Sequence, residues 1–156
     1  ISQIAGTKVY VQATASGPMG VRADDGKLLW TYDIERTTAV IPTPIVRGDL
    51  VFFAAGYKRG GALLRQVPGS DGEIKVEEVY PLNKELANKH GGIVLVGDHL
   101  YGDSDDAGIP FCAELMTGET ALPDLAPLPQ ALDQHRGVHK VDPFPADAPQ
   151  VAANDR

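Results

Sequence analysis

The chain has 156 residues, 43% of them hydrophobic and 22% charged, which is the composition of a globular protein and excludes a wholly disordered chain. Its net charge of −7 comes with scattered rather than clustered basic residues, so nucleic acid is not an expected partner. The longest apolar runs are of strand length, which excludes a membrane-spanning helix of about 18–20 residues.

The first predicted unit covers about residues 1–35 and contains two glycine turns. "AGTKVYV" places Gly6 before a strand-like run, and "DDGKLLWTY" places the Asp25–Gly26 turn four residues before Trp30, the single tryptophan. We expect Gly26 to form a hairpin turn and Trp30 to hold a buried, structural position beside Leu28 and Leu29.

The second predicted unit, at about 42–80, shows the strand pattern most clearly. Four runs of strand length, "PTPIVRG", "DLVFFAAG", "GALLRQV" and "EIKVEEVY", are bounded by Gly, Asp or Pro. The central runs are apolar on both faces, whereas the last alternates Ile74 and Val76 with charged residues. This pattern predicts a four-stranded antiparallel sheet with covered inner strands and a half-exposed outer strand.

The third predicted unit covers about 90–122, with the runs "VGDHLYG" and "PFCAELMTGE". Its one cysteine, Cys112, has no partner for an intramolecular disulfide and is expected to fill a strand. His90 stands before paired glycines at the start of this unit. It is a candidate for a channel-facing position, with a hydrogen bond to a neighbouring loop as the structural alternative.

A regular spacing links the three units. Gly26, Gly72 and Gly118 follow one another at intervals of 46 residues, and each belongs to a turn dipeptide. Sheets buried on both faces need other sheets above and below them, and repeated units achieve this by radial stacking. We therefore predict an all-β partial β-propeller of about three four-stranded antiparallel blades. A β-sandwich is the alternative, although it does not require the recurrence.

An irregular tail is predicted over residues 123–156. Sixteen of the 17 glycines precede it, whereas six of the 12 prolines fall within it. No run in it pairs as a strand, so we expect an extended or disordered segment with at most a helical turn at "PQALDQH". His135 and His139 are four residues apart, but the proline-rich context argues against a metal site there.

The segments "GVRADDGKLLWTY", "IPTPIVRGDLVFFAAGYKRGGALL" and "HGGIVLVGDHLYG" give the chain a family resemblance. Over residues 1–122 it resembles the PQQ-like β-propeller repeats, the tryptophan-docking blades of quinoproteins. The resemblance implies that Trp30, four residues after its turn glycine, packs between adjacent blades. In the later units Val76 and Leu122 stand four residues after the turn glycine instead of a tryptophan. Seven or eight blades close such propellers, so it also implies a fragment whose terminal sheets favour oligomerisation or low stability.

The resemblance implies two classes of function. The first is a non-catalytic scaffold that binds a protein partner in the periplasm or outside the cell, as propellers of outer-membrane assembly do. The second is part of a PQQ-dependent alcohol dehydrogenase, whose longer parent would bind PQQ and calcium. No adjacent cysteine pair or catalytic Asp of that enzyme class can be assigned to this sequence, and the scaffold is the preferred interpretation.

One acidic stretch, "YGDSDDAG", is a candidate metal site, which makes a calcium-stabilised extracellular propeller a third class of function. Asp103, Asp105 and Asp106 supply the carboxylate oxygens that calcium prefers in a glycine-flanked loop. The stretch lacks the 12-residue pattern of an EF-hand, and a solvated loop between the second and third strands of a blade explains it as well.

Thermal melting tests the calcium hypothesis. A calcium ion bound by these three aspartates stabilises the folded state by mass action, so millimolar calcium should raise Tm and the D103N variant should lose that rise. Magnesium at the same concentration is the control for ionic strength. An unchanged Tm in calcium removes the hypothesis.

Overall fold

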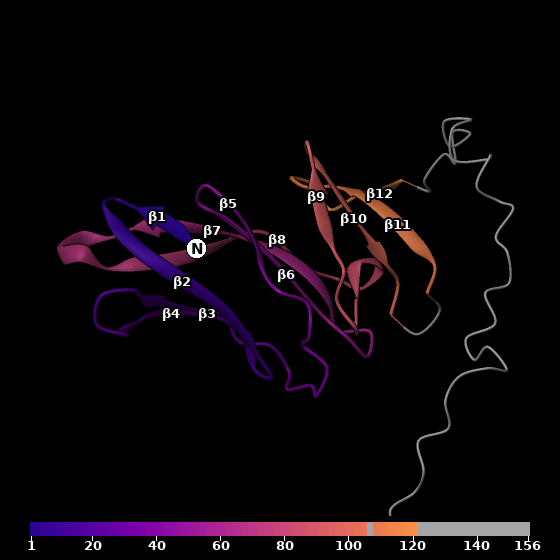
Figure 1. The fold of residues 1–156 in the computed structure, drawn as a ribbon, viewed down its shortest axis with the longest axis horizontal. Helices are drawn as coiled ribbons and strands as arrows, with labels where there is room; N and C mark the ends of the chain where they lie inside the picture. Colours follow the sequence, from indigo (N-terminus) through magenta and orange to yellow (C-terminus); the bar gives the residue numbers. More distant parts are fainter. Residues whose placement is uncertain (106–107, 122–156) are drawn as a thin grey trace, which may run out of the picture. The chain divides into compact units, whose positions relative to one another are not determined.

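The computed structural model describes residues 1–105 and 108–121, and their strands form three four-stranded antiparallel sheets (Figure 1). Blade 1 contains β1 (Ser2–Ile4), β2 (Thr7–Thr14), β3 (Gly17–Arg22) and β4 (Leu28–Thr31). Blade 2 contains β5 (Ile45–Arg47), β6 (Leu50–Ala55), β7 (Gly60–Pro68) and β8 (Ile74–Asn83). Blade 3 contains β9 (Val94–Val96), β10 (His99–Asp103), β11 (Pro110–Glu114) and β12 (Thr120–Ala121).

These sheets confirm the predicted all-β partial propeller. Within each blade the strands are neighbours in chain order, so every connection inside a blade is a hairpin. In the described part of the chain the other regular elements are two 3-10 turns, Ser70–Gly72 and Lys84–Leu86. The predicted tail at 123–156 lies outside the described residues.

The 46-residue spacing marks the last hairpin connection of each blade. Gly26 joins β3 to β4, Gly72 joins β7 to β8, and Gly118 joins β11 to β12. Their φ angles are 72°, 75° and 68°, a left-handed conformation that glycine adopts without steric cost. In blades 1 and 3 the glycine N–H donates to the carbonyl four residues back, whereas blade 2 has a 3-10 turn in which Asp71 also has a positive φ. The recurrence in the sequence is therefore that of a glycine at one hairpin position.

Blade 2 has a core on both of its faces. Val51 and Phe53 of β6 pack into a cluster with blade 1, whereas Leu50 and Phe52 of the same strand pack into a cluster with blade 3. All six residues of β6 are buried. Burying one such side chain contributes roughly 1.5–3 kcal/mol, so this strand stabilises two interfaces at once. The outer strand β8 is largely exposed or half-buried, as predicted.

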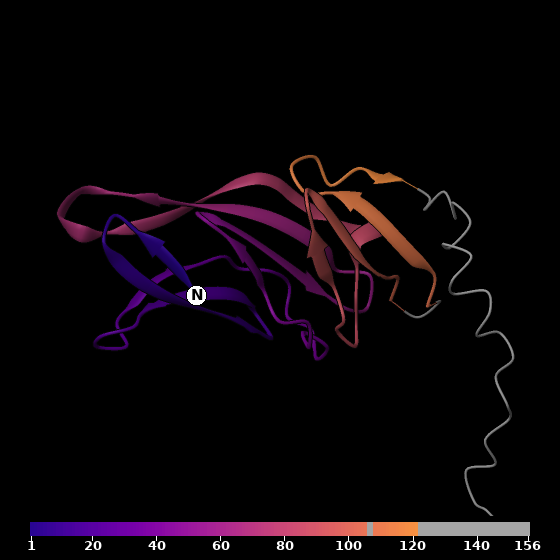
Figure 2. The ribbon, with the colours of Figure 1, turned by 45° about the horizontal axis from the view of Figure 1, so that its top comes forward.

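The hairpin of β7 and β8 extends alongside blade 1. β8 contacts β4, and β7 contacts β1, and both views show the hairpin running past the first sheet (Figures 1 and 2). Ile74 and Val76 at the start of β8 belong to the apolar cluster shared with blade 1. Val76, which stands at the tryptophan offset, therefore faces the preceding blade.

An aromatic side chain links blade 2 to the next turn. Tyr80 of β8 packs against Gly118, where an added Cβ would lie 2.9 Å from two carbons of the ring. Asn83 Nδ2 donates a hydrogen bond of 3.0 Å to the carbonyl oxygen of Gly118. Burial of Tyr80 raises the pKa of its phenol, which stays neutral at physiological pH.

Replacing two turn glycines by alanine separates two contributions to the loss of stability. One is the steric clash with Tyr80, and the other is the strain of alanine in a left-handed conformation. Gly97 also has a left-handed φ, 58°, but an added Cβ there meets nothing within 4 Å. G97A should therefore cost only the backbone strain, about 1 kcal/mol. G118A should cost roughly 1–3 kcal/mol more in urea unfolding, because Tyr80 must move. Equal losses for the two variants would contradict the Tyr80 contact.

Candidate functional site

Trp30 joins blade 1 to blade 2. Its side chain is 5% exposed and belongs to the apolar cluster that the two blades share. The indole lies against Gly20 of β3, where a Cβ would collide with the ring, and indole Nε1 donates a 3.3 Å hydrogen bond to Gln66 Oε1 of β7. Trp30 is thus held between a glycine of its own sheet and an amide of the next.

Gln66 is the buried polar partner of this contact. It is 2% exposed, and its Nε2 donates a 2.9 Å hydrogen bond to Ser2 Oγ of β1. Ser2 Oγ also lies within 3.0 Å of Gln66 Oε1. Because an unpaired amide at this depth costs about 1–3 kcal/mol, the set Ser2–Gln66–Trp30 fixes how the two sheets pack.

Tyr32 forms a second link between the same blades. Its hydroxyl donates a 2.5 Å hydrogen bond to Glu78 Oε1, and its ring meets Phe53 edge-on with centroids 5.7 Å apart. Partial burial, and then the bond to the Glu78 carboxylate, raise the pKa of Tyr32 to about 12. The phenol is therefore neutral and donates this hydrogen bond at neutral pH.

The aspartates of the predicted calcium loop hold neighbouring loops together. Asp103 Oδ1 accepts a 2.7 Å hydrogen bond from Asn88 Nδ2. Asp105 Oδ2 accepts one of 2.8 Å from the backbone N–H of Lys58, and the Asp105 N–H donates to the Ala87 carbonyl. Asp106 lies outside the described residues, within which no group of acids, histidines or cysteines is arranged to hold a metal ion. The calcium site stays a prediction.

The remaining candidates are placed as follows. His90 is exposed in the segment between blades 2 and 3, next to Gly91, whose N–H donates a 2.7 Å hydrogen bond to Asn88 Oδ1. Its channel-facing role stays a prediction. Cys112 is buried as a free thiol in β11. His135 and His139 lie outside the described residues.

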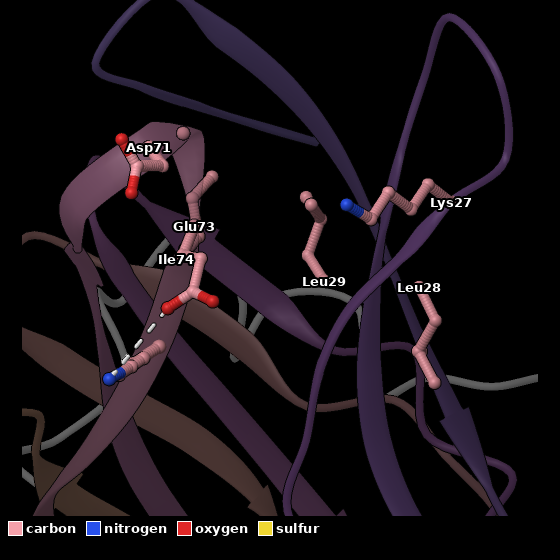
Figure 3. A pocket seen from close by; sticks show the side chains of 8 residues that line it. Lys27, Leu28, Leu29, Asp71, Glu73 and Ile74 are labelled. Atoms are coloured by element: carbon pink, nitrogen blue, oxygen red, sulfur yellow. Dashed lines mark ion pairs between the residues drawn. The ribbon is translucent and has the colours of Figure 1, made fainter.

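A pocket of about 300 Å3 lies between the last hairpin turns of blades 1 and 2. We call it the turn notch, and it is lined by Lys27, Leu28, Leu29 and residues 71–75. Figure 3 shows Lys27 and Leu29 extending toward the opposite hairpin, whereas Leu28 points away from it. Buried Ile74 and half-buried Leu29 supply apolar surface, and Glu73 pairs with Lys75 at 3.8 Å.

Both walls of the turn notch are held by hydrogen bonds within their own turns. On one side Lys27 N–H donates to Asp25 Oδ1 at 3.0 Å, and the Arg22 N–H donates to the Lys27 carbonyl at 2.8 Å. On the other side Gly69 N–H donates to the Glu73 carbonyl at 2.8 Å. These hydrogen bonds hold the two turns that form the pocket, whose lining combines amines, carboxylates and aliphatic groups.

Sequence reasoning missed several of these groups. Ser2 and Gln66 are polar residues in strand-like runs. The available signal was Gln66 itself, an uncharged polar residue within the mostly apolar run "GALLRQV". Tyr80 lies eight residues after its turn glycine, outside the four-residue offset of Trp30. The turn notch arises from two hairpins 46 residues apart, whose proximity no local pattern reveals.

Three sheets stacked through shared apolar clusters, with a tryptophan buried between two of them, define a β-propeller repeat protein. A family model described as outer membrane protein assembly factor BamB matches residues 1–122. The chain belongs to this family of PQQ-like propeller repeats. A search of curated proteins gave no match. Among the described residues, no helix is long and apolar enough to cross a membrane.

Alanine substitution measures the contribution of Trp30. W30A removes the indole from the interface between blades 1 and 2 and should lower the free energy of unfolding by about 3–5 kcal/mol. L28A, two residues away on the same strand at a side chain that is 53% exposed, is the matched control and should change it by less than about 0.5 kcal/mol. Urea unfolding followed by circular dichroism gives both values. Similar small losses would refute the interlocking role of Trp30.

Proposed function

We propose that the chain is a non-catalytic scaffold that binds another protein in the cell envelope. The observation that carries the proposal is the turn notch, which is formed in advance and combines an apolar floor with charged walls. Such a combination suits recognition of a peptide segment, because apolar contact supplies affinity and the charges select among partners. Membership of a family described by an outer-membrane assembly factor supports a protein partner.

The use of the polar side chains also supports a scaffold. The buried or half-buried polar groups near the blade interfaces, Ser2, Gln66, Asn88, Asp103 and Asp105, hydrogen-bond to neighbouring strands or loops. They hold the blades in place, which is the requirement for a rigid binding surface. A periplasmic or extracellular location for the chain is part of this proposal.

Site-specific photo-crosslinking in the producing cell tests the proposal. A photoreactive amino acid placed in turn at five exposed apolar positions samples separate surfaces: Leu28, Tyr57, Val96, Tyr101 and Ile109. We expect adducts with a defined protein at a subset of positions, and direct binding when that protein is purified and added back. Uniform or absent adducts, together with quinone absorbance and dye-linked alcohol oxidation after PQQ addition, would instead establish the dehydrogenase.

A further inference from the structure

The turn notch lies beside a free strand edge. β4 is the last strand of blade 1 and pairs through its backbone with β3, while no described strand pairs with its other edge. An unpaired edge presents N–H and C=O groups that can accept an added strand. Leu28 and Leu29 belong both to β4 and to the lining of the turn notch, so the edge and the pocket are continuous.

The side chains around this edge have a distinct charge arrangement. Lys27 extends toward the opposite hairpin, and no ion pair joins it to the other residues drawn in Figure 3. Asp71 and Glu73 stand on the opposite hairpin, where Glu73 pairs with Lys75. One wall is therefore basic and the other mainly acidic, with Leu29 and Ile74 between them.

We propose that the turn notch binds an extended segment of a partner protein, which adds to the free edge of β4 as an extra strand. The segment would place an aliphatic side chain over Leu29 and Ile74, a carboxylate at Lys27 Nζ and a basic group toward Asp71. Because alternate residues of a strand share one face, these three side chains stand at every second position. The proposal rests on the scaffold function and specifies its partner chemistry.

The edge and the charges have separate roles in this binding. Backbone hydrogen bonds to β4 would supply sequence-independent affinity, whereas the pocket and its two charged walls would select the sequence. The strand edge is only four residues long, Leu28–Thr31, so a segment of about seven residues covers it with its flanks. A segment with reversed charge opposite Lys27 would meet a like charge and bind less tightly.

A designed peptide tests the proposal on the full chain. The capped heptapeptide TETVTKT carries the acid, the aliphatic residue and the base on one face. In a 15N–1H NMR titration we expect amide shifts confined to residues 27–31 and 71–75. K27E should weaken binding roughly five- to tenfold, whereas K8E, the same charge reversal next to Tyr10 and outside the notch, should leave it unchanged.

A backbone-modified peptide tests strand addition itself. N-methylation of alternate amides of TETVTKT keeps every side chain but removes the N–H donors along one edge of the peptide. Binding should be lost when that edge is the one that pairs with β4. Both N-methyl patterns are therefore measured. Binding that survives in both, shifts elsewhere in the protein, equal affinity of K27E and wild type, or no shifts at millimolar peptide would each overturn the proposal.

These results are distinguishable from failure of the scaffold function. A reconstituted partner that crosslinks elsewhere, with no peptide binding at the notch, would retain the scaffold function and remove this docking site. Quinone-dependent oxidation without a protein partner would remove the scaffold function, whatever the peptide does.

Discussion

The fold depends on a middle sheet whose two faces are both buried. β6 sends Val51 and Phe53 toward blade 1 and Leu50 and Phe52 toward blade 3, so neither neighbour can be removed without exposing a core. Hydrophobic burial has no preferred direction, and other contacts must therefore set how the sheets are oriented. The Ser2–Gln66–Trp30 set does so on one side, and the packing of Tyr80 on Gly118 does so on the other.

This arrangement also explains where binding surface is available. Stacking buries the faces of the sheets against one another and leaves the hairpin turns and outer strands exposed. The last turns of blades 1 and 2 form the turn notch, whose walls are held by hydrogen bonds within each turn. The position of the notch therefore follows from the repeat itself.

The outer blades present a different kind of surface. Tyr10, Val21 and Leu28 are cross-strand neighbours in blade 1, and Tyr10 and Leu28 are substantially exposed. Val94 and Tyr101 are exposed cross-strand neighbours in blade 3. These rows are consistent in composition with contact surfaces. The expectation that the terminal sheets favour oligomerisation stays a prediction.

The sequence predicted most of the fold because strands and turns are local features. Alternation, glycine turns and the 46-residue recurrence can be recognised without knowing which residues are in contact. They predicted three four-stranded sheets and, in the second sheet, the inner and outer strands. Contacts between sheets are different. Ser2 and Gln66 are 64 residues apart, and their pairing depends on how the blades stack. The irregular pairing at Gly20 and Val21 likewise turns Leu28 away from the notch.

The repeat alone also treated Gly26, Gly72 and Gly118 as equivalent. The structure shows that Gly118 alone among these three is crowded by an aromatic side chain from the preceding blade. The left-handed glycine is common to the three turns, whereas their packing is not, and the blade 2 turn also differs in its hydrogen bonds. The turn notch is more distant still from the sequence, because it requires two hairpins to be adjacent in space.

Native-state hydrogen exchange measures the central claim that the middle sheet holds the described blades together. The hydrogen-bonded amides of β6 and β7 should exchange only when the opening with the highest free energy takes place. The same opening should also expose the hydrogen-bonded amides of blades 1 and 3. The account predicts the slowest exchange in blade 2. Exchange in β6 as fast as in β1 or β9, or a blade 1 that stays protected while blade 2 opens, would contradict it.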